Sequence, residues 1–95
     1  MSGIEDHKII LDQAYDIYVE RRKAYGDASA FMERVAGVCG MTREQVALVF
    51  LATKMVRSTT TQDAKDLEDT LLDLINYSAI LLDLFRESKV IPGLK

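Results

Sequence analysis

Hydrophobic residues recur along the chain with a period near 3.6, and the alternation typical of strands is almost absent. A first helix is predicted from about residue 5 to residue 25, with an apolar half made of Ile10, Leu11, Ala14, Tyr15, Ile17 and Tyr18. Gly26 is expected to stop it, because glycine readily takes the positive φ found after helix ends. Asp12, Asp16 and Glu20 project from the opposite side, where a solvated stripe is expected.

A second helix is predicted at about residues 28–39, between Asp27, which can cap its first turn, and Gly40, which ends it. The segment Thr42-Arg-Glu-Gln45 then forms a capping box, in which hydroxyl and amide side chains satisfy opposite backbone donors. The residues that follow, Val46–Val56, are apolar around the full circumference of a helix. This pattern predicts the central buried helix of the fold.

A fourth helix is predicted from Thr61 or Asp63 to about Ser88, after a polar turn. One side of this helix is expected to face the core, namely Leu67, Leu71, Leu74, Ile75, Ser78 and Leu82. Four helices with short loops predict an all-α four-helix bundle. The chain is read as a single domain, residues 1–95, with loose termini at 1–4 and 90–95.

Composition and charge narrow the class of protein. The chain is 48% hydrophobic and 28% charged, as in ordinary globular proteins, and its net charge of −3 argues against a binder of DNA or RNA duplexes. The longest apolar run, Val46–Ala52, is too short to span a bilayer, so no membrane partner is expected. The single cysteine, Cys39, is expected to be a small buried hydrophobe in a reduced, cytoplasmic protein.

The other side of the fourth helix is acidic. Asp69 and Asp73 are four residues apart and therefore neighbours on the helix surface, with Tyr77 one turn further. A solvated acidic face is one interpretation. However, the same side continues as Ile80, Leu81 and Leu84, which indicates that another helix or another subunit covers it.

Basic residues stand on other predicted helices. Lys54 and Arg57, three residues apart, can neutralise phosphate oxygens, extend to solvent from a buried helix, or pair with the carboxylates Asp69 and Asp73. Arg22 falls on the apolar side of the first helix, so plain solvent exposure does not explain it.

These residues carry a resemblance to a family of small phage and prophage proteins. The resemblance covers about residues 9–84, and its motifs are Arg22-x-x-Tyr25-Gly26-Asp27, Met32-Glu-Arg-Val-Ala36, Thr42-x-x-Gln-Val46-Ala, Lys54-x-x-Arg57 and Asp69-x-x-x-Asp73-x-x-x-Tyr77. That family is in turn similar to the MazG-like all-α nucleoside triphosphate pyrophosphatases. The resemblance implies a MazG-like arrangement of helices and a homo-oligomer.

In the pyrophosphatases, acidic side chains hold Mg²⁺ on the triphosphate of a nucleotide, and water attacks between the α- and β-phosphates. Carried over to this chain, the resemblance makes Asp69 and Asp73 catalytic and makes Asp69, Asp73 and Glu20 the ligands of Mg²⁺. It places Arg22, Lys54 and Arg57 on phosphate oxygens, and Tyr25 and Tyr77 on the base or sugar.

The chain also departs from those patterns. It has no E-x-x-E pair, and Ala28, Phe31 and Asn76 stand where the phage pattern has Pro, Asn and Gly. Two classes of function therefore stay open. One is a Mg²⁺-dependent pyrophosphohydrolase of nucleoside triphosphates. The other is a non-catalytic oligomer that sequesters a nucleotide or docks on a host protein. Hydrolysis needs at least three acids converging on one point, whereas sequestration needs only basic and aromatic groups.

Overall fold

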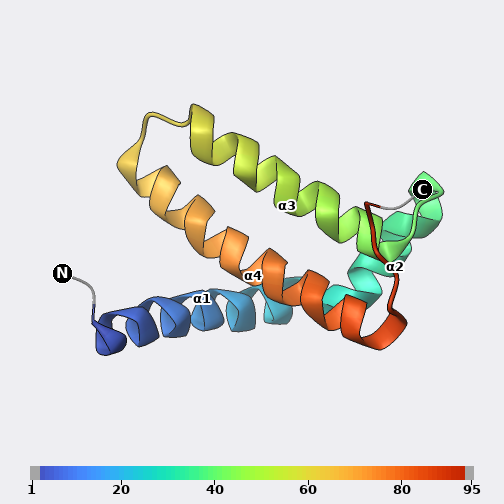
Figure 1. The fold of residues 1–95 in the computed structure, drawn as a ribbon, viewed down its shortest axis with the longest axis horizontal. Coiled ribbons are helices and arrows are strands. Elements are labelled where there is room, and N and C mark those ends of the chain that lie inside the picture. Colours follow the sequence, from blue (N-terminus) through green and yellow to red (C-terminus); the bar gives the residue numbers. More distant parts are fainter. Residues whose placement is uncertain (1–2, 94–95) are drawn as a thin grey trace.

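The computed structural model describes residues 3–93, which form four α-helices and no strand (Figure 1). These helices are α1 (Ile4–Tyr25), α2 (Ala28–Cys39), α3 (Arg43–Thr60) and α4 (Ala64–Ser88). Helices α3 and α4 lie side by side as an antiparallel hairpin, α1 crosses α4, and α2 packs near the start of α3. The prediction of an all-α helical bundle is confirmed.

Local capping interactions fix the ends of the helices. Asp27 Oδ2 accepts a hydrogen bond from Ala30 N–H at 3.2 Å and so caps α2. At the start of α3, Gln45 N–H donates to Thr42 Oγ1 at 3.1 Å, and Thr42 N–H donates to Gln45 Oε1 at 2.9 Å. Asp63 caps α4. Gly40 ends α2 in the left-handed conformation, with φ of 67°.

The hydrophobic core is small and lies where α2, α3 and the second half of α4 meet. Its buried members are Met32, Ala36, Val46, Ala47 and Leu84, with Val35, Phe50, Tyr77, Ile80 and Leu81 packed against them. Outside this cluster Ala14, in α1, is buried against α4. The core therefore holds the hairpin and α2 together, and no residue of α1 belongs to it.

The prediction that α3 is buried all round is wrong. Only its Val46–Ala47 side is buried, and Val49, Met55 and Val56 are 49%, 55% and 62% exposed. Helices α2 and α4 cover one side of α3, and no further helix of residues 3–93 covers the other. The helix is also longer than its apolar run, because the capping box starts it at Arg43.

The predicted orientation of α4 is wrong as well. Leu71, Ser78 and Leu82 were expected in the core but are exposed. The side that carries Asp73 and Tyr77 faces inward instead, since Thr70 and Asp73 are 2% and 5% exposed, whereas Asp69 of the acidic pair stays exposed. Another helix of the same chain, α3, covers that side, as one of the two interpretations of the acidic face requires.

Two smaller expectations also need correction. Cys39 is exposed rather than buried, because it is the last residue of α2 and lies beyond the core. The expected loose start does not extend to residues 3 and 4, since Ile4 begins α1 and Gly3 N–H donates to Asp6 Oδ2 at 2.9 Å. Residues 1, 2, 94 and 95 lie outside the described part of the chain.

Within residues 3–93, no single helix is long and apolar enough to cross a membrane. Helices α2 and α3 taken together reach that length and hydrophobicity, but they meet at a bend of 99°.

We expect Leu84→Ala to lower the free energy of unfolding by about 2–5 kcal/mol, because the side chain is fully buried and its removal leaves a cavity. Val38→Ala, at a residue that is 88% exposed, should change it by less than about 0.5 kcal/mol. Urea denaturation followed by circular dichroism measures both. Equal effects of the two substitutions would contradict the position of the core.

Candidate functional site

A buried carboxylate joins three helices. Asp73 of α4 is paired with Arg21 of α1, at 3.2 Å from Nη2 to Oδ1, and with Lys54 of α3, at 3.1 Å from Nζ to Oδ2. Each carboxylate oxygen therefore has its own cation, which compensates the loss of hydration on burial. The triad of two cations and one anion carries a net positive charge into the space beside it.

That space is a cavity of about 330 Å³ lined by α1, α2, α4 and Phe50 of α3. Three of its lining side chains form an aromatic wall. The rings of Phe31 and Phe50 are stacked at 6.2 Å between centroids, and those of Phe50 and Tyr77 at 5.7 Å. The other lining residues used below are Arg21, Arg22, Tyr25, Asp73 and Asn76. We call this cavity the aromatic pocket.

A hydrogen bond fixes α1 at the edge of the aromatic pocket. Asn76 Nδ2 donates to the backbone carbonyl of Ala14 at 2.8 Å. Ala14 is 1% exposed, and its small side chain lets α1 approach α4 closely enough for this contact. Asn76 therefore holds α1 on α4.

The turn between α1 and α2 borders the same pocket. Arg22 Nη1 lies 3.4 Å from Asp27 Oδ1, while the other oxygen of Asp27 caps α2. The Arg22 side chain is 57% exposed and Tyr25 is 71% exposed, so both keep access to solvent at the pocket. A ligand can reach these two side chains without disturbing the core.

The remaining candidate residues lie elsewhere. Arg57 pairs with Asp66 at 3.1 Å near the α3–α4 turn, Asp69 is exposed, and Glu20 lies 3.6 Å from Lys23 on the outer side of α1. Within residues 3–93, no three His, Cys, Asp or Glu side chains come together in a way that would hold a metal ion. The structure thus gathers Arg22, Tyr25, Lys54, Asp73 and Tyr77 at or beside the pocket and leaves Glu20, Arg57 and Asp69 apart.

No family model, curated protein or solved structure matches the chain. The residues that line the pocket indicate which ligands it can bind. An aromatic wall accepts a planar ring, and guanidinium groups beside it accept an anion such as a phosphate.

Sequence reasoning missed Arg21, Phe31, Phe50 and Asn76. Arg21 was detectable, because Ala14, Ile17 and Arg21 follow one another at the spacing of a single helix face. The aromatic wall was not, since Phe31 and Phe50 come from different helices and meet only through the packing of α2 on α3.

Asp73→Asn is expected to lower the free energy of unfolding by about 1–3 kcal/mol, because it leaves Lys54 and Arg21 without their shared anion. The loss stays below that of a fully buried ion pair, since half of the Arg21 side chain can rehydrate. Asp69→Asn, four residues away and exposed, is the matched control and should have little effect. Chemical denaturation of both variants checks this.

The pair Arg57–Asp66 predicts a pH dependence of stability. A hydrogen bond from the Thr61 hydroxyl, supported by Arg57, lowers the pKa of Asp66 below its ordinary value of 3.8. A lowered folded-state pKa means that the contribution is complete above pH 3.8 and disappears as the pH falls through the folded-state pKa. Asp66→Asn should therefore reduce stability at neutral pH and converge with wild type in acid, as measured by urea denaturation across pH. A constant difference would contradict this assignment.

Proposed function

We propose that this protein binds a nucleotide, or another phosphorylated small molecule with a planar ring, in the aromatic pocket and does not hydrolyse it. The observation that carries the proposal is the meeting of an aromatic wall and two arginines in one cavity of about 330 Å³. This volume lies at the lower end of the roughly 300–1,000 Å³ typical of small-molecule pockets. The proposed setting is the cytoplasm, where a nucleotide is available.

The aromatic wall supports the binding of a base. Phe31, Phe50 and Tyr77 offer ring surface at the pocket, and one aromatic contact is worth about 0.5–1.5 kcal/mol beyond the area that it buries. Tyr25, exposed at the end of α1, is placed to close over a bound ring or sugar.

The arginines support the binding of a phosphate. A guanidinium has five N–H donors, so Arg21 keeps donors for a ligand while it holds Asp73. Arg22 likewise keeps donors for a ligand while it pairs with Asp27. Because Asp73 is outnumbered by Arg21 and Lys54, an anion beside the triad is attracted rather than repelled.

The acidic residues favour binding over hydrolysis. Both oxygens of Asp73 are engaged by cations, Asp69 is exposed, and Glu20 lies on the outer side of α1 beside Lys23. This donor set does not fit a Mg²⁺ site made by the described residues alone. In this proposal, a Mg²⁺ ion that accompanies the nucleotide is held by the ligand's own phosphates and by water.

Binding is tested with a panel of nucleoside mono- and triphosphates by calorimetry and thermal stabilisation. Arg22→Gln should raise the dissociation constant of the nucleotide by about tenfold or more, because it removes a charged donor to phosphate. Arg34→Gln is the matched control, an exposed arginine of α2 that does not line the pocket. Tyr25→Ala should weaken the binding of nucleotides more than the binding of inorganic phosphate. Equal affinity in all variants, or no binding by the wild type, would contradict the proposal.

Hydrolysis is tested separately by pyrophosphate release from the same panel with Mg²⁺. We expect no turnover by the wild type above the level of Asp73→Asn. Turnover that Asp69→Asn or Asp73→Asn abolishes would replace the binding proposal with the pyrophosphohydrolase that the resemblance implies.

A further inference from the structure

Helix α4 has an apolar side that no helix in the described part of the chain covers. Leu71, Ile75, Ser78 and Leu82 follow one another at spacings of four, three and four residues. Leu71 and Leu82 are 46% and 47% exposed. This spacing is that of a seam between packed helices in coiled coils and four-helix bundles. The sequence therefore encodes a packing surface that the single chain leaves in solvent.

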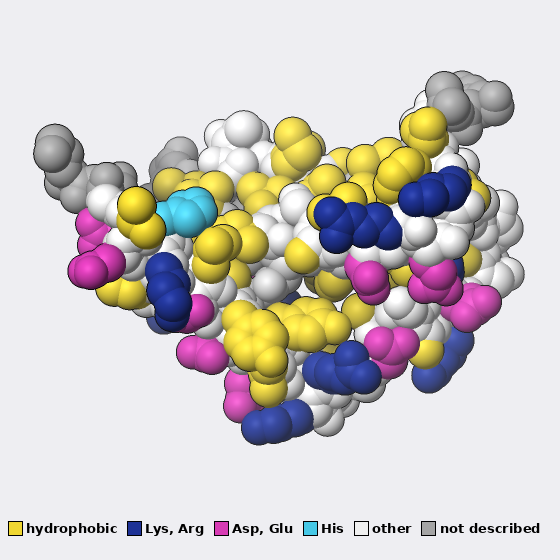
Figure 2. All heavy atoms as spheres, turned by 60° about the horizontal axis from the view of Figure 1, so that its bottom comes forward, with side chains coloured by type: hydrophobic (Ala, Val, Ile, Leu, Met, Phe, Trp, Pro, Cys, Tyr) yellow, Lys and Arg dark blue, Asp and Glu magenta, His cyan; other side chains and the backbone are white. Residues whose placement is uncertain are grey.

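A second apolar stripe runs beside it on α1. Leu11, Tyr15 and Tyr18 have the same spacing, and Leu11 and Tyr15 are 43% and 64% exposed. A groove of about 420 Å³ lies between the two helices, and Leu11 and Tyr15 line it on α1 while Ile75 and Ala79 line it on α4. Figure 2 looks from the α1 side and shows hydrophobic side chains gathered near the middle of this face, with charged groups beside and around them.

The chain exposes more surface than a compact monomer of its mass, enough in total to supply a homodimer interface. The chain exposes 6983 Å², whereas a compact monomer of 10.7 kDa exposes about 5,500 Å². Its radius of gyration is 14.3 Å, against about 12.4 Å for a compact domain of this length. The excess of about 1,500 Å² per chain lies within the range that obligate homodimers bury, roughly 1,000–2,500 Å² per subunit.

We infer that a second copy of this chain covers this face, with the two α4 helices antiparallel across a two-fold axis near Ser78 and Ala79. These small side chains allow the helix axes to approach closely at the axis. The arrangement places Leu82 against the partner's Ile75, and the reverse contact follows from the symmetry. The two α1 helices then flank the α4 pair. This inference does not rest on the proposed nucleotide site.

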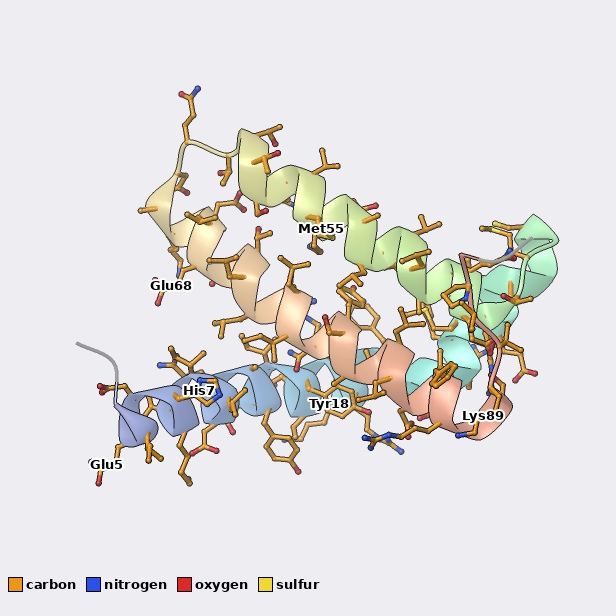
Figure 3. All side chains as sticks on the ribbon, in the orientation of Figure 1. Glu5, His7, Tyr18, Met55, Glu68 and Lys89 are labelled. Atoms are coloured by element: carbon orange, nitrogen blue, oxygen red, sulfur yellow. The ribbon has the colours of Figure 1, made fainter. Side chains whose placement is uncertain are left out.

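Charge selects the antiparallel direction. Glu68 lies near the start of α4, whereas Arg86 and Lys89 lie at its end, and Figure 3 shows Glu68 and Lys89 at opposite ends of the helix. Antiparallel pairing brings Glu68 beside the partner's Arg86, while parallel pairing would bring the two Glu68 side chains together. None of the ion pairs within residues 3–93 uses Glu68 or Arg86, so both remain available for an intersubunit pair.

The oligomeric state is tested by sedimentation and light scattering over a dilution series. The wild type should be a dimer, and Leu82→Glu should raise its dissociation constant at least about a hundredfold, or about tenfold for each of the two copies. Val38→Glu, at an apolar residue of α2 that is 88% exposed, is the control and should remain dimeric. A folded wild type that is monomeric at every concentration would overturn the inference.

The direction of pairing is tested by disulfide trapping in a Cys39→Ser background. Ser78→Cys should give a covalent dimer on oxidation, because this position lies near the axis. Glu68→Cys should form no covalent dimer alone but should form one when mixed with Arg86→Cys protein. Rapid self-linking of Glu68→Cys would indicate parallel helices, and failure of Ser78→Cys to link would place the interface elsewhere. Either result overturns the proposed arrangement.

Discussion

One buried carboxylate joins α1 to both helices of the α3–α4 hairpin. Asp73 ties Arg21 of α1 and Lys54 of α3 to α4, and it is the only ion-paired carboxylate among the described residues that reaches from α4 to both of those helices. The core of α2, α3 and α4 would hold without it, but no residue of α1 belongs to that core. Because Arg21 and Asp73 also line the aromatic pocket, the contact that joins α1 to the hairpin also sets the charge of the pocket.

The helix ends were predictable from sequence because they are encoded locally. Asp27, the Thr42–Gln45 pair and Asp63 each act on backbone groups within three residues, so no tertiary information is needed to place them. The faces of the helices were less predictable. Helix α4 carries apolar residues on more than one side, and the pattern alone does not decide which side meets the same chain and which remains exposed.

The candidate site was predictable in part for the same reason. Spacing on α4 places Asp73 and Tyr77 on one face, and the structure keeps them together at the aromatic pocket. The spacing of Ala14, Ile17 and Arg21 places Arg21 on one face of α1, but it does not show that this face meets Asp73, so Arg21 was missed in favour of its neighbour Arg22. Arg57 was expected to help bind phosphate, but the structure pairs it with Asp66, near the α3–α4 turn. Residues from separate helices meet by packing, and packing is decided by the whole chain.

The connection between α1 and α2 consists of only Gly26 and Asp27. A link this short fixes the rotation of α2 about its own axis relative to α1. One residue inserted into the first turn of α2, between Asp27 and Phe31, would turn Phe31 by about 100° about the helix axis, since an α-helix has 3.6 residues per turn. Phe31 would then leave Phe50, and the aromatic wall would lose one of its three rings. The number of residues between the Asp27 cap and Phe31 therefore helps to specify the shape of the pocket, in addition to the side chains that line it.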